Sequence, residues 1–142
     1  MLKNIDPLLS SDMLYALNAM GHGDTLVIVD AGFPTTAKAG HRHISMPGNS
    51  ASDVLEAVLT VLPLDTFTPC PMKVMKPENS DVLPEAAEDF VRVLRHSEEL
   101  GQEWEAVDRF SFYDVSEKAQ LIISTADTRP YACLALVKGL IF

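Results

Sequence analysis

The chain has 142 residues and a mass of 15.5 kDa, a size typical of one domain, which we expect to span residues 1–142. Apolar residues make up 47% of the chain and charged residues 22%, which is enough to bury a sizeable core and excludes intrinsic disorder. The net charge of −9 predicts no nucleic acid and no anionic membrane as partner, whereas a neutral small molecule meets no electrostatic penalty.

The cysteines and the N-terminus predict a cellular compartment. Cys70 and Cys133 lie far apart and form no C-x-x-C pair, so we expect neither a disulfide framework nor a zinc ribbon. Residues 1–7 lack the apolar stretch of a signal peptide, and no segment approaches the roughly 20 apolar residues of a membrane span. We therefore expect a cytoplasmic protein.

The first third of the chain predicts a helix followed by a buried strand. Apolar residues recur at helical spacing from Leu9 to Met20, after serines that suit a helix N-cap, and Gly21 ends the pattern. After the turn at 21–24 comes the β-branched run Thr25–Val29, which does not alternate with polar residues. Such a run is typical of a strand that is buried on both faces.

The remainder of the chain predicts further helices and strands. Residues 33–49 show no defensible period and are expected to form a loop that shapes a site. The segment 68–77 carries Pro69, Pro71 and Pro77, which favours a short edge strand over a central one. We expect helices at 50–62, 84–94 and 109–113, and strands at 121–123 and 131–137. Helices mixed with buried strands predict a three-layer α/β/α sandwich around a mostly buried sheet.

The chain ends on three apolar residues, Leu140-Ile141-Phe142. Chain termini usually fray, so an apolar end needs a surface that covers it. Either a subunit interface or docking within the same chain as the last residues of the sheet would supply that cover.

Two residues beside the first strand are candidates for chemistry. His22 lies between two glycines at the turn before the strand, where its imidazole is accessible to a ligand, and histidine titrates nearest to neutral pH. Asp30 follows the strand, and ligands of open α/β sheets commonly bind at the carboxyl ends of strands. A polar turn histidine and a turn-capping aspartate are the structural alternatives.

Two residues later in the chain are further candidates. Arg109 precedes the aromatic residues Phe110, Phe112 and Tyr113, and a guanidinium held against aromatic rings can donate to hydroxyl or ring oxygens. Pairing with Asp108 or Asp114 is the alternative for this arginine. Tyr131 begins the last predicted strand, where its phenol either reaches a site or packs at the sheet edge.

Other site signatures are weak or absent. His41-x-His43 has the spacing of two metal ligands, but no third ligand is indicated nearby, so we expect no metal. The patterns G-x-G-x-x-G, P-loop, G-x-S-x-G and H-E-x-x-H do not occur, so the usual dinucleotide, phosphate and hydrolase signatures are missing.

Five short motifs together resemble the RbsD/FucU family of sugar mutarotases, and the resemblance covers nearly the whole chain. The motifs are Gly21-His22-Gly23-Asp24, Asp30-Ala31-Gly32-Phe33-Pro34, Ser52-Asp53-Val54-Leu55, Arg109-Phe110-Ser111-Phe112-Tyr113, and Pro130-Tyr131-Ala132-Cys133 running into Lys138-Gly139. The resemblance implies an enzyme that interconverts ring forms of a free monosaccharide, uses no cofactor, and assembles as a homodecameric ring with sites shared between neighbouring subunits. Such a ring would cover the apolar C-terminus.

The resemblance also implies roles for individual residues. The catalytic histidine of the family falls on His22, and its sugar-binding positions fall on Asp30, Arg109 and the triplet Tyr131-Ala132-Cys133. The family usually has Asn where this chain has Cys133, and a thiol is a weak hydrogen-bond partner. Therefore either one sugar contact is lost or the preferred sugar differs.

The motifs divide between the two branches of the family. Gly21-His22-Gly23-Asp24 and the block that begins at Arg109 look like the fucose branch, whereas Asp30-Ala31-Gly32 looks like the ribose branch. We favour L-fucose because the resemblance places Arg109 in the site. The alternatives are a D-ribose pyranase, a non-catalytic sugar-binding or transport-accessory protein, and a purely structural ring subunit.

The spacing of His22 and Asp30 sets a geometric condition. Eight fully extended residues would span on the order of 25 Å, at about 3.3 Å each. That length is too great for both side chains to touch one sugar ring. Either the segment bends, or one of the two assignments is wrong.

Overall fold

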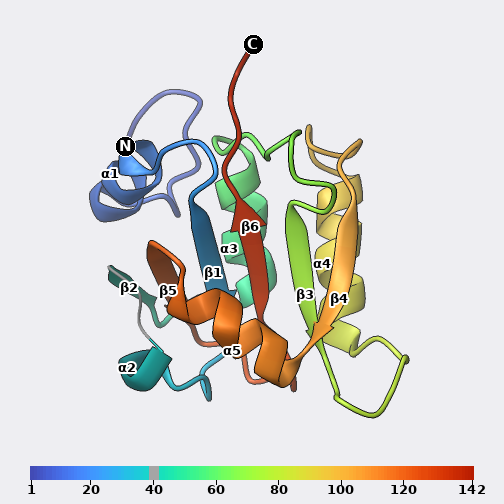
Figure 1. Ribbon diagram of the computed structural model, residues 1–142. Coiled ribbons are helices and arrows are strands. Elements are labelled where there is room, and N and C mark those ends of the chain that lie inside the picture. The colour runs from blue at the N-terminus through green and yellow to red at the C-terminus, as the bar shows by residue number, and fades with distance from the viewer. Residues whose placement is uncertain (39–41) are drawn as a thin grey trace.

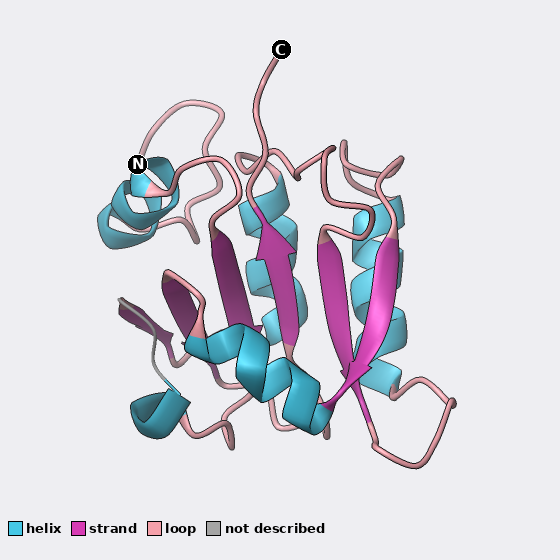
Figure 2. Ribbon diagram, viewed as in Figure 1, coloured by secondary structure: helices cyan, strands magenta, loops and turns pink. Residues whose placement is uncertain are grey.

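The computed structural model describes residues 1–38 and 42–142 and forms a six-stranded mixed sheet with helices on both faces (Figures 1 and 2). The helices are α1 (Ser11–Ala19), α2 (Thr35–Lys38), α3 (Ala51–Leu59), α4 (Glu85–Arg95) and α5 (Arg109–Glu117). The strands are β1 (Thr25–Val29), β2 (His43–Met46), β3 (Met72–Lys76), β4 (Trp104–Asp108), β5 (Leu121–Thr125) and β6 (Leu134–Val137). The predicted α/β/α sandwich is therefore confirmed.

The strand order is β2-β5-β1-β6-β3-β4. The neighbouring pairs are parallel except at β6, which runs antiparallel to both β1 and β3. Five strands therefore end at one edge of the sheet, called here the carboxyl edge, where β6 begins. The opposite edge, called the amino edge, holds the starts of those five strands and the end of β6.

The uninterrupted apolar run of β1 is explained by helices on both faces of the sheet. Leu26 and Ile28 belong to the larger core, which also contains the buried faces of α1, α3 and α4. Val27 and Val29 point to the other face, where they share a smaller core with Phe112 of α5. Successive residues of a strand point to opposite faces of the sheet, and both faces are covered here. Every residue of β1 except the first, Thr25, is therefore apolar and buried.

Two predictions, a loop at 33–49 and an edge strand at 68–77, were wrong. The segment 33–49 is not a continuous loop, because it contains α2 and β2. The predicted edge strand at 68–77 is an interior strand, β3, paired with both β6 and β4. Its prolines lie outside the strand, at 69, 71 and 77, so no ladder hydrogen bond is lost to them.

Several element bounds also differ from prediction. The second helix, expected to reach residue 62, ends at Leu59, and the Thr60 hydroxyl donates to the carbonyl of Ala57 at 2.6 Å. The last strand begins at Leu134 rather than at Tyr131. Tyr131 has a left-handed φ of 58°, which is incompatible with an extended strand.

The C-terminal tail lies outside the sheet. Beyond the end of β6 at the amino edge, the tail projects away from the body of the molecule (Figure 1). Leu140, Ile141 and Phe142 are 46%, 86% and 90% exposed. Docking within the chain as the last sheet residues is therefore not observed.

Candidate functional site

The sequence candidates lie at opposite edges of the sheet. His22 precedes β1 at the amino edge, and Asp30 follows β1 at the carboxyl edge. The strand between them is fully extended, and its five residues alone span about 13 Å. The segment between His22 and Asp30 therefore does not bend enough to bring the two side chains together within one chain.

His22 is held at the amino edge by a small set of side chains that we call the amino-edge cluster: His22, Asp65, Phe67, Thr68 and Phe142. The imidazole Nε2 lies 2.9 Å from Oδ1 of Asp65. The ring centroid of Phe67 lies 5.3 Å from that of His22, and Phe142 packs edge-on against Phe67 at 6.5 Å. The His22 side chain is 37% exposed, which leaves the imidazole accessible to a ligand.

Asp65 is the principal site residue that the sequence analysis missed. It is buried, and its carboxylate accepts hydrogen bonds from the Thr68 hydroxyl at 2.5 Å and from the backbone N–H of Phe67 at 3.1 Å. The Thr68 hydrogen bond, joined by the contact with His22, lowers the pKa of Asp65 to about 2 against the opposing effect of burial. An aspartate in a loop between two predicted elements carries no sequence signal that distinguishes it from a turn residue.

The backbone around this cluster is tied together by the end of β6. Gly23 N–H donates to Lys138 O at 2.8 Å, and Asp65 N–H donates to Val137 O at 2.9 Å. A Cβ on Gly139 would lie 2.5 Å from Leu64 O, so only glycine permits this close approach of the two chain segments. The end of β6 therefore sets where His22 and Asp65 meet.

Lys138 also fixes α1, the helix that leads into the His22 turn. Its ammonium donates to the carbonyls of Leu17 and Met20, at 2.8 and 2.6 Å. These carbonyls belong to the last turn of the helix, where a cation is favourable. The lysine therefore holds the end of α1 against the same segment that positions His22.

We expect Asp65→Asn to lower the free energy of unfolding at neutral pH. The carboxyl has a lower pKa in the folded protein than its ordinary 3.8, so folding favours its ionised form, and this contribution is fully present above pH 3.8. It is lost as the pH falls towards about 2. Urea midpoints of the wild type and the variant should therefore converge over that interval. A gap that stays constant from pH 7 to pH 2 would contradict this assignment.

Asp30 and Cys133 meet at the carboxyl edge. The Cys133 thiol donates to Oδ2 of Asp30 at 3.4 Å, and the backbone N–H of Gly32 donates to Oδ1 at 2.9 Å. Asp30 is partly exposed, whereas Cys133 is 1% exposed. The thiol therefore orients the carboxylate from the buried side. Asp30 is the member of the pair that presents a polar group to the surface.

The burial of Cys133 predicts its reactivity. Burial, and then the neighbouring Asp30 charge, raise the pKa of the Cys133 thiol, and the thiolate is the form that reacts with alkylating reagents. Cys70 is only partly buried. We therefore expect iodoacetamide at pH 8 to label Cys70 in the folded protein and to label Cys133 only after denaturation, as measured by peptide mass spectrometry. Labelling of both at equal rates would contradict the buried position.

Tyr131 lies at the carboxyl edge in a turn that is hydrogen-bonded to other parts of the chain through Arg129 and Asp127. Arg129 donates to both carboxylate oxygens of Asp127, at 3.0 and 2.8 Å, and to Asp89 at 3.1 Å and Ser52 at 2.9 Å. The buried Asp127 also accepts from the backbone N–H of Ala51 at 3.0 Å. This network joins the turn to the start of α3 and to α4, and thereby fixes the segment that carries Tyr131.

Arg109 is the first residue of α5, directly after β4 ends at the carboxyl edge. Its Nε donates to Glu78 at 2.9 Å, and this ion pair raises the pKa of the guanidinium. The predicted packing against aromatic rings is observed, with the guanidinium carbon 4.8 Å from the Phe110 ring centroid and 5.9 Å from that of Tyr113. The ion partner is Glu78 rather than the Asp108 or Asp114 considered from the sequence.

Three candidates therefore share the carboxyl edge with Cys133, and we call Asp30, Arg109, Tyr131 and Cys133 the carboxyl-edge cluster. Within it, β1 and β4 are separated by β6 and β3, a lateral distance of about 14 Å at the usual spacing of strands. Aromatic contacts of Tyr113 span part of that distance, because its ring lies 5.6 Å from the ring of Phe33, three residues after Asp30.

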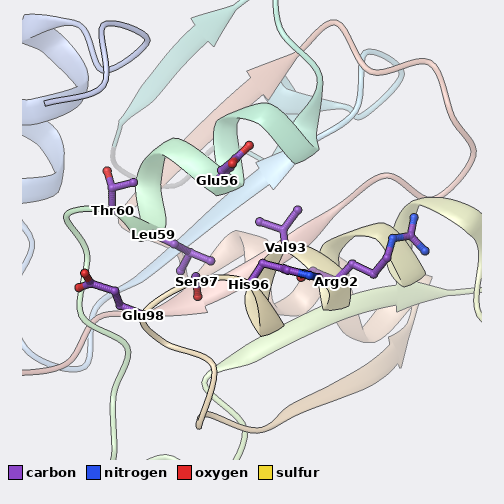
Figure 3. A pocket seen from close by; sticks show the side chains of 8 residues that line it. All are labelled: Glu56, Leu59, Thr60, Arg92, Val93, His96, Ser97 and Glu98. Carbon is purple, nitrogen blue, oxygen red and sulfur yellow. The ribbon is translucent and has the colours of Figure 1, made fainter.

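The groove between α3 and α4 and the histidine pair at 41 and 43 contribute no further candidate for the site. A groove between α3 and α4 is lined by the residues that Figure 3 labels, and its histidine, His96, donates from Nδ1 to the carbonyl of Arg92 at 2.7 Å. The predicted histidine pair falls partly outside the described residues, at His41, and His43 contacts Ser124. Over residues 1–38 and 42–142, no three His, Cys, Asp or Glu side chains are arranged to hold a metal.

A separate property of the helices is whether any of them could cross a membrane. Within the part of the chain that the structure describes, none of them combines the length and the apolar character required to cross a bilayer.

The chain is similar to known proteins in both sequence and structure. The RbsD / FucU transport protein family matches residues 3–141. The fucose mutarotase of Bos taurus is 35% identical over 147 residues, covering 99% of this chain and 94% of the relative. The crystal structure of the fucose mutarotase of Streptococcus pneumoniae in complex with L-fucose has a TM-score of 0.89 and 30% identity, covering 99% of this chain and 100% of that chain.

A more distant structure extends the likeness in fold alone. Bacillus subtilis RbsD, solved in complex with D-ribose, has a TM-score of 0.76 and 24% identity, with all of both chains covered. With the match over residues 3–141, this chain belongs to the RbsD/FucU family of sugar mutarotases.

Proposed function

We propose that this protein is a mutarotase that interconverts the ring forms of free L-fucose. The proposal is carried by similarity over almost the whole chain to proteins named as fucose mutarotases, one of them solved with L-fucose. It is supported by the position of His22, the expected catalytic residue, in an accessible and hydrogen-bonded setting.

The reaction consists of two proton transfers and one bond cleavage. A base removes the proton of the anomeric hydroxyl, the bond between the anomeric carbon and the ring oxygen breaks, and an acid protonates the ring oxygen. The resulting aldehyde rotates and the same steps in reverse close the ring on its other face. His22 serves as general acid and base, for which a positioned group typically contributes about 10²- to 10⁴-fold.

The carboxyl-edge cluster supplies the substrate contacts. The Asp30 carboxylate accepts hydrogen bonds from sugar hydroxyls, and the Arg109 guanidinium donates to hydroxyl or ring oxygens. Tyr131 assists with its phenol. Cys133 acts through Asp30, because its thiol is buried and directed at that carboxylate.

The two clusters complete one site only if two subunits meet. Within one chain they lie at opposite edges of the sheet, so a single sugar ring contacts both only when the amino edge of one subunit faces the carboxyl edge of the next. A head-to-tail contact of this kind forms a closed ring when the rotation from each subunit to the next adds up to a full turn. We propose that the assembly is a homodecamer. The exposed Phe67 and the apolar tail from Leu140 to Phe142 would be covered by that contact.

Saturation-transfer proton NMR of anomer exchange tests the function. Catalytic amounts of the 142-residue protein are added to L-fucose and, in parallel, to D-ribose, and the exchange rates are compared with those in buffer. Accelerated exchange of L-fucose supports the proposal, and faster exchange of D-ribose would instead identify a pyranase. Binding of either sugar with exchange at the buffer rate would identify a non-catalytic binding protein.

The residue at position 133 bears on which sugar is preferred. The buried Cys133 replaces the asparagine usual in the family and contacts Asp30, so the hydrogen bonds offered to the sugar differ from the family pattern. Measuring the exchange rates of L-fucose and D-ribose with wild type and with Cys133→Asn tests whether residue 133 causes a difference in sugar preference. A shift of preference towards one sugar in the variant would make residue 133 a determinant of specificity.

A further inference from the structure

We propose that Arg129 is a positioning residue that holds Tyr131 in a defined place relative to Asp30 at the carboxyl edge. The inference rests on the proposed function for the contact of Tyr131 and Asp30 with a sugar. For the turn that joins the two residues, it rests on the structure alone.

Tyr131 has a backbone conformation that its own side chain disfavours. Its φ of 58° lies in the left-handed region, where the Cβ of an L-residue crowds a backbone carbonyl oxygen. A residue other than glycine keeps such a conformation only where the surrounding structure enforces it. The turn at 130–131 therefore depends on contacts that hold it from outside.

Arg129, two residues before Tyr131, supplies these contacts. Its guanidinium donates to both carboxylate oxygens of one partner and to one oxygen of each of two others, which are Asp127, Asp89 and Ser52. Its backbone N–H also donates to Oδ1 of Asp127, at 3.0 Å. A guanidinium presents its donors in a rigid planar fork, so contacts with three side chains restrict it to one orientation.

Asp127 joins the same turn to the backbone on both sides of Asp30. Its carbonyl accepts from the N–H of Ala31 at 2.9 Å. Its N–H donates to the Thr125 hydroxyl at 3.2 Å, and that hydroxyl donates to the carbonyl of Val29 at 2.8 Å. Asp127 is thus a fixed reference for Asp30, and the arginine that binds the Asp127 carboxylate aligns the following residues with it.

Burial makes these contacts difficult to replace with water. The Asp127 side chain is 2% exposed and that of Arg129 is 27% exposed. The guanidinium carbon also lies 5.9 Å from the centroid of the Phe90 ring. Hydrogen bonds between charged groups are strong where little solvent competes for them. A change at residue 129 should therefore displace the turn.

Arg129→Lys is the main test variant. The ammonium keeps a cation beside the buried Asp127, so that carboxylate is not left unpaired. It cannot reproduce the planar fork that contacts three side chains at once. Arg129→Ala removes every side-chain contact and is the more severe variant. Arg92→Ala is the matched control, because Arg92 donates to the other oxygen of Asp89, at 3.1 Å, from a side chain that is 60% exposed.

Fluorine NMR of protein labelled with 3-fluorotyrosine tests the position of Tyr131 without a sugar. The chain has three tyrosines, and the signal that Tyr131→Phe removes belongs to Tyr131. We expect this signal to move in Arg129→Lys and Arg129→Ala and to keep its wild-type position in Arg92→Ala. The signals of Tyr15 and Tyr113, on α1 and α5, should stay in place and thereby show that the fold is intact.

Anomer-exchange rates test whether Arg129 acts through Tyr131. We expect Arg129→Lys to lower the acceleration of L-fucose exchange by about 10-fold, because a misplacement of about 1 Å can cost up to about 10²-fold. In the Tyr131→Phe background the same substitution should cost less than about twofold, since the contact that it misplaces is already absent. Thermal unfolding midpoints should fall equally in both backgrounds. Arg92→Ala should exchange L-fucose at the wild-type rate.

Three results would overturn the inference. They are a Tyr131 signal that does not move in Arg129→Lys, a wild-type exchange rate in that variant, and a loss of rate that is equal in both backgrounds, as a purely structural residue would give. Arg129→Lys carries this test even when Arg129→Ala does not fold. Failure of the proposed function would look different, because wild type would then leave anomer exchange at the buffer rate for L-fucose and D-ribose. The fluorine signal would still test the placement of Tyr131.

Discussion

His22→Ala is expected to reduce the acceleration of anomer exchange by about 10²- to 10⁴-fold, the usual contribution of a positioned acid–base group. The side chain is 37% exposed and lies in a turn, so its removal leaves no large cavity in the core. The loss should therefore appear in the rate and not in the fold. Saturation-transfer NMR on L-fucose measures the rate, and circular dichroism and size-exclusion chromatography check the fold and the assembly.

A second histidine provides the control for this experiment. His96→Ala removes an exposed imidazole at the end of α4, where it donates to its own helix, and it should leave the exchange rate unchanged. A His22→Ala protein that is folded, assembled and as fast as wild type would remove His22 from the catalytic role and direct attention to Tyr131.

Mixed assemblies of two inactive variants are expected to regain about a quarter of the wild-type activity per site. If each site takes His22 from one subunit and Asp30 from its neighbour, His22→Ala and Asp30→Ala damage opposite edges of the protein. When the two chains mix randomly in a closed ring, about one contact in four joins two intact edges. Each variant alone has no intact site, so the recovered rate measures the sharing directly.

The experiment uses co-refolded chains with two different tags, purified over both tags before the exchange rate is measured. Asp30→Ala mixed with Arg109→Ala is the matched control, because both residues lie at the carboxyl edge and no contact in that mixture has an intact carboxyl-edge cluster. Recovery in the first mixture alone would establish shared sites. Doubly tagged assemblies that stay as inactive as their parents would place the whole site within one chain.

Local sequence patterns predicted much of the fold because they depend on neighbouring residues. Helical spacing and an N-cap serine specified α1, where Ser10 accepts from the Met13 N–H at 3.3 Å. The apolar run of β1 predicted a strand covered on both faces, as observed. Such patterns indicate which residues of a segment are buried and where a helix is capped, and both depend on residues within that segment.

The same patterns were insufficient where pairing partners decide the structure. β2 is a short strand at the edge of the sheet with alternating exposure, and its sequence includes no apolar run. β3 became interior because β4 and β6 supply partners on both sides. Whether a strand lies at an edge is a property of its neighbours, and prolines just outside the strand gave the wrong indication.

By itself the sequence determined the composition of the core, most of the helices and strands, and the motifs that point to His22, Asp30, Arg109 and the turn at Tyr131. Only the tertiary structure decided that His22 lies at one edge of the sheet and the other candidates at the opposite edge. It also decided that Asp65, 43 residues from His22 in the chain, holds the imidazole. Long-range contacts of this kind arise from how the segments pack together, which no local pattern encodes.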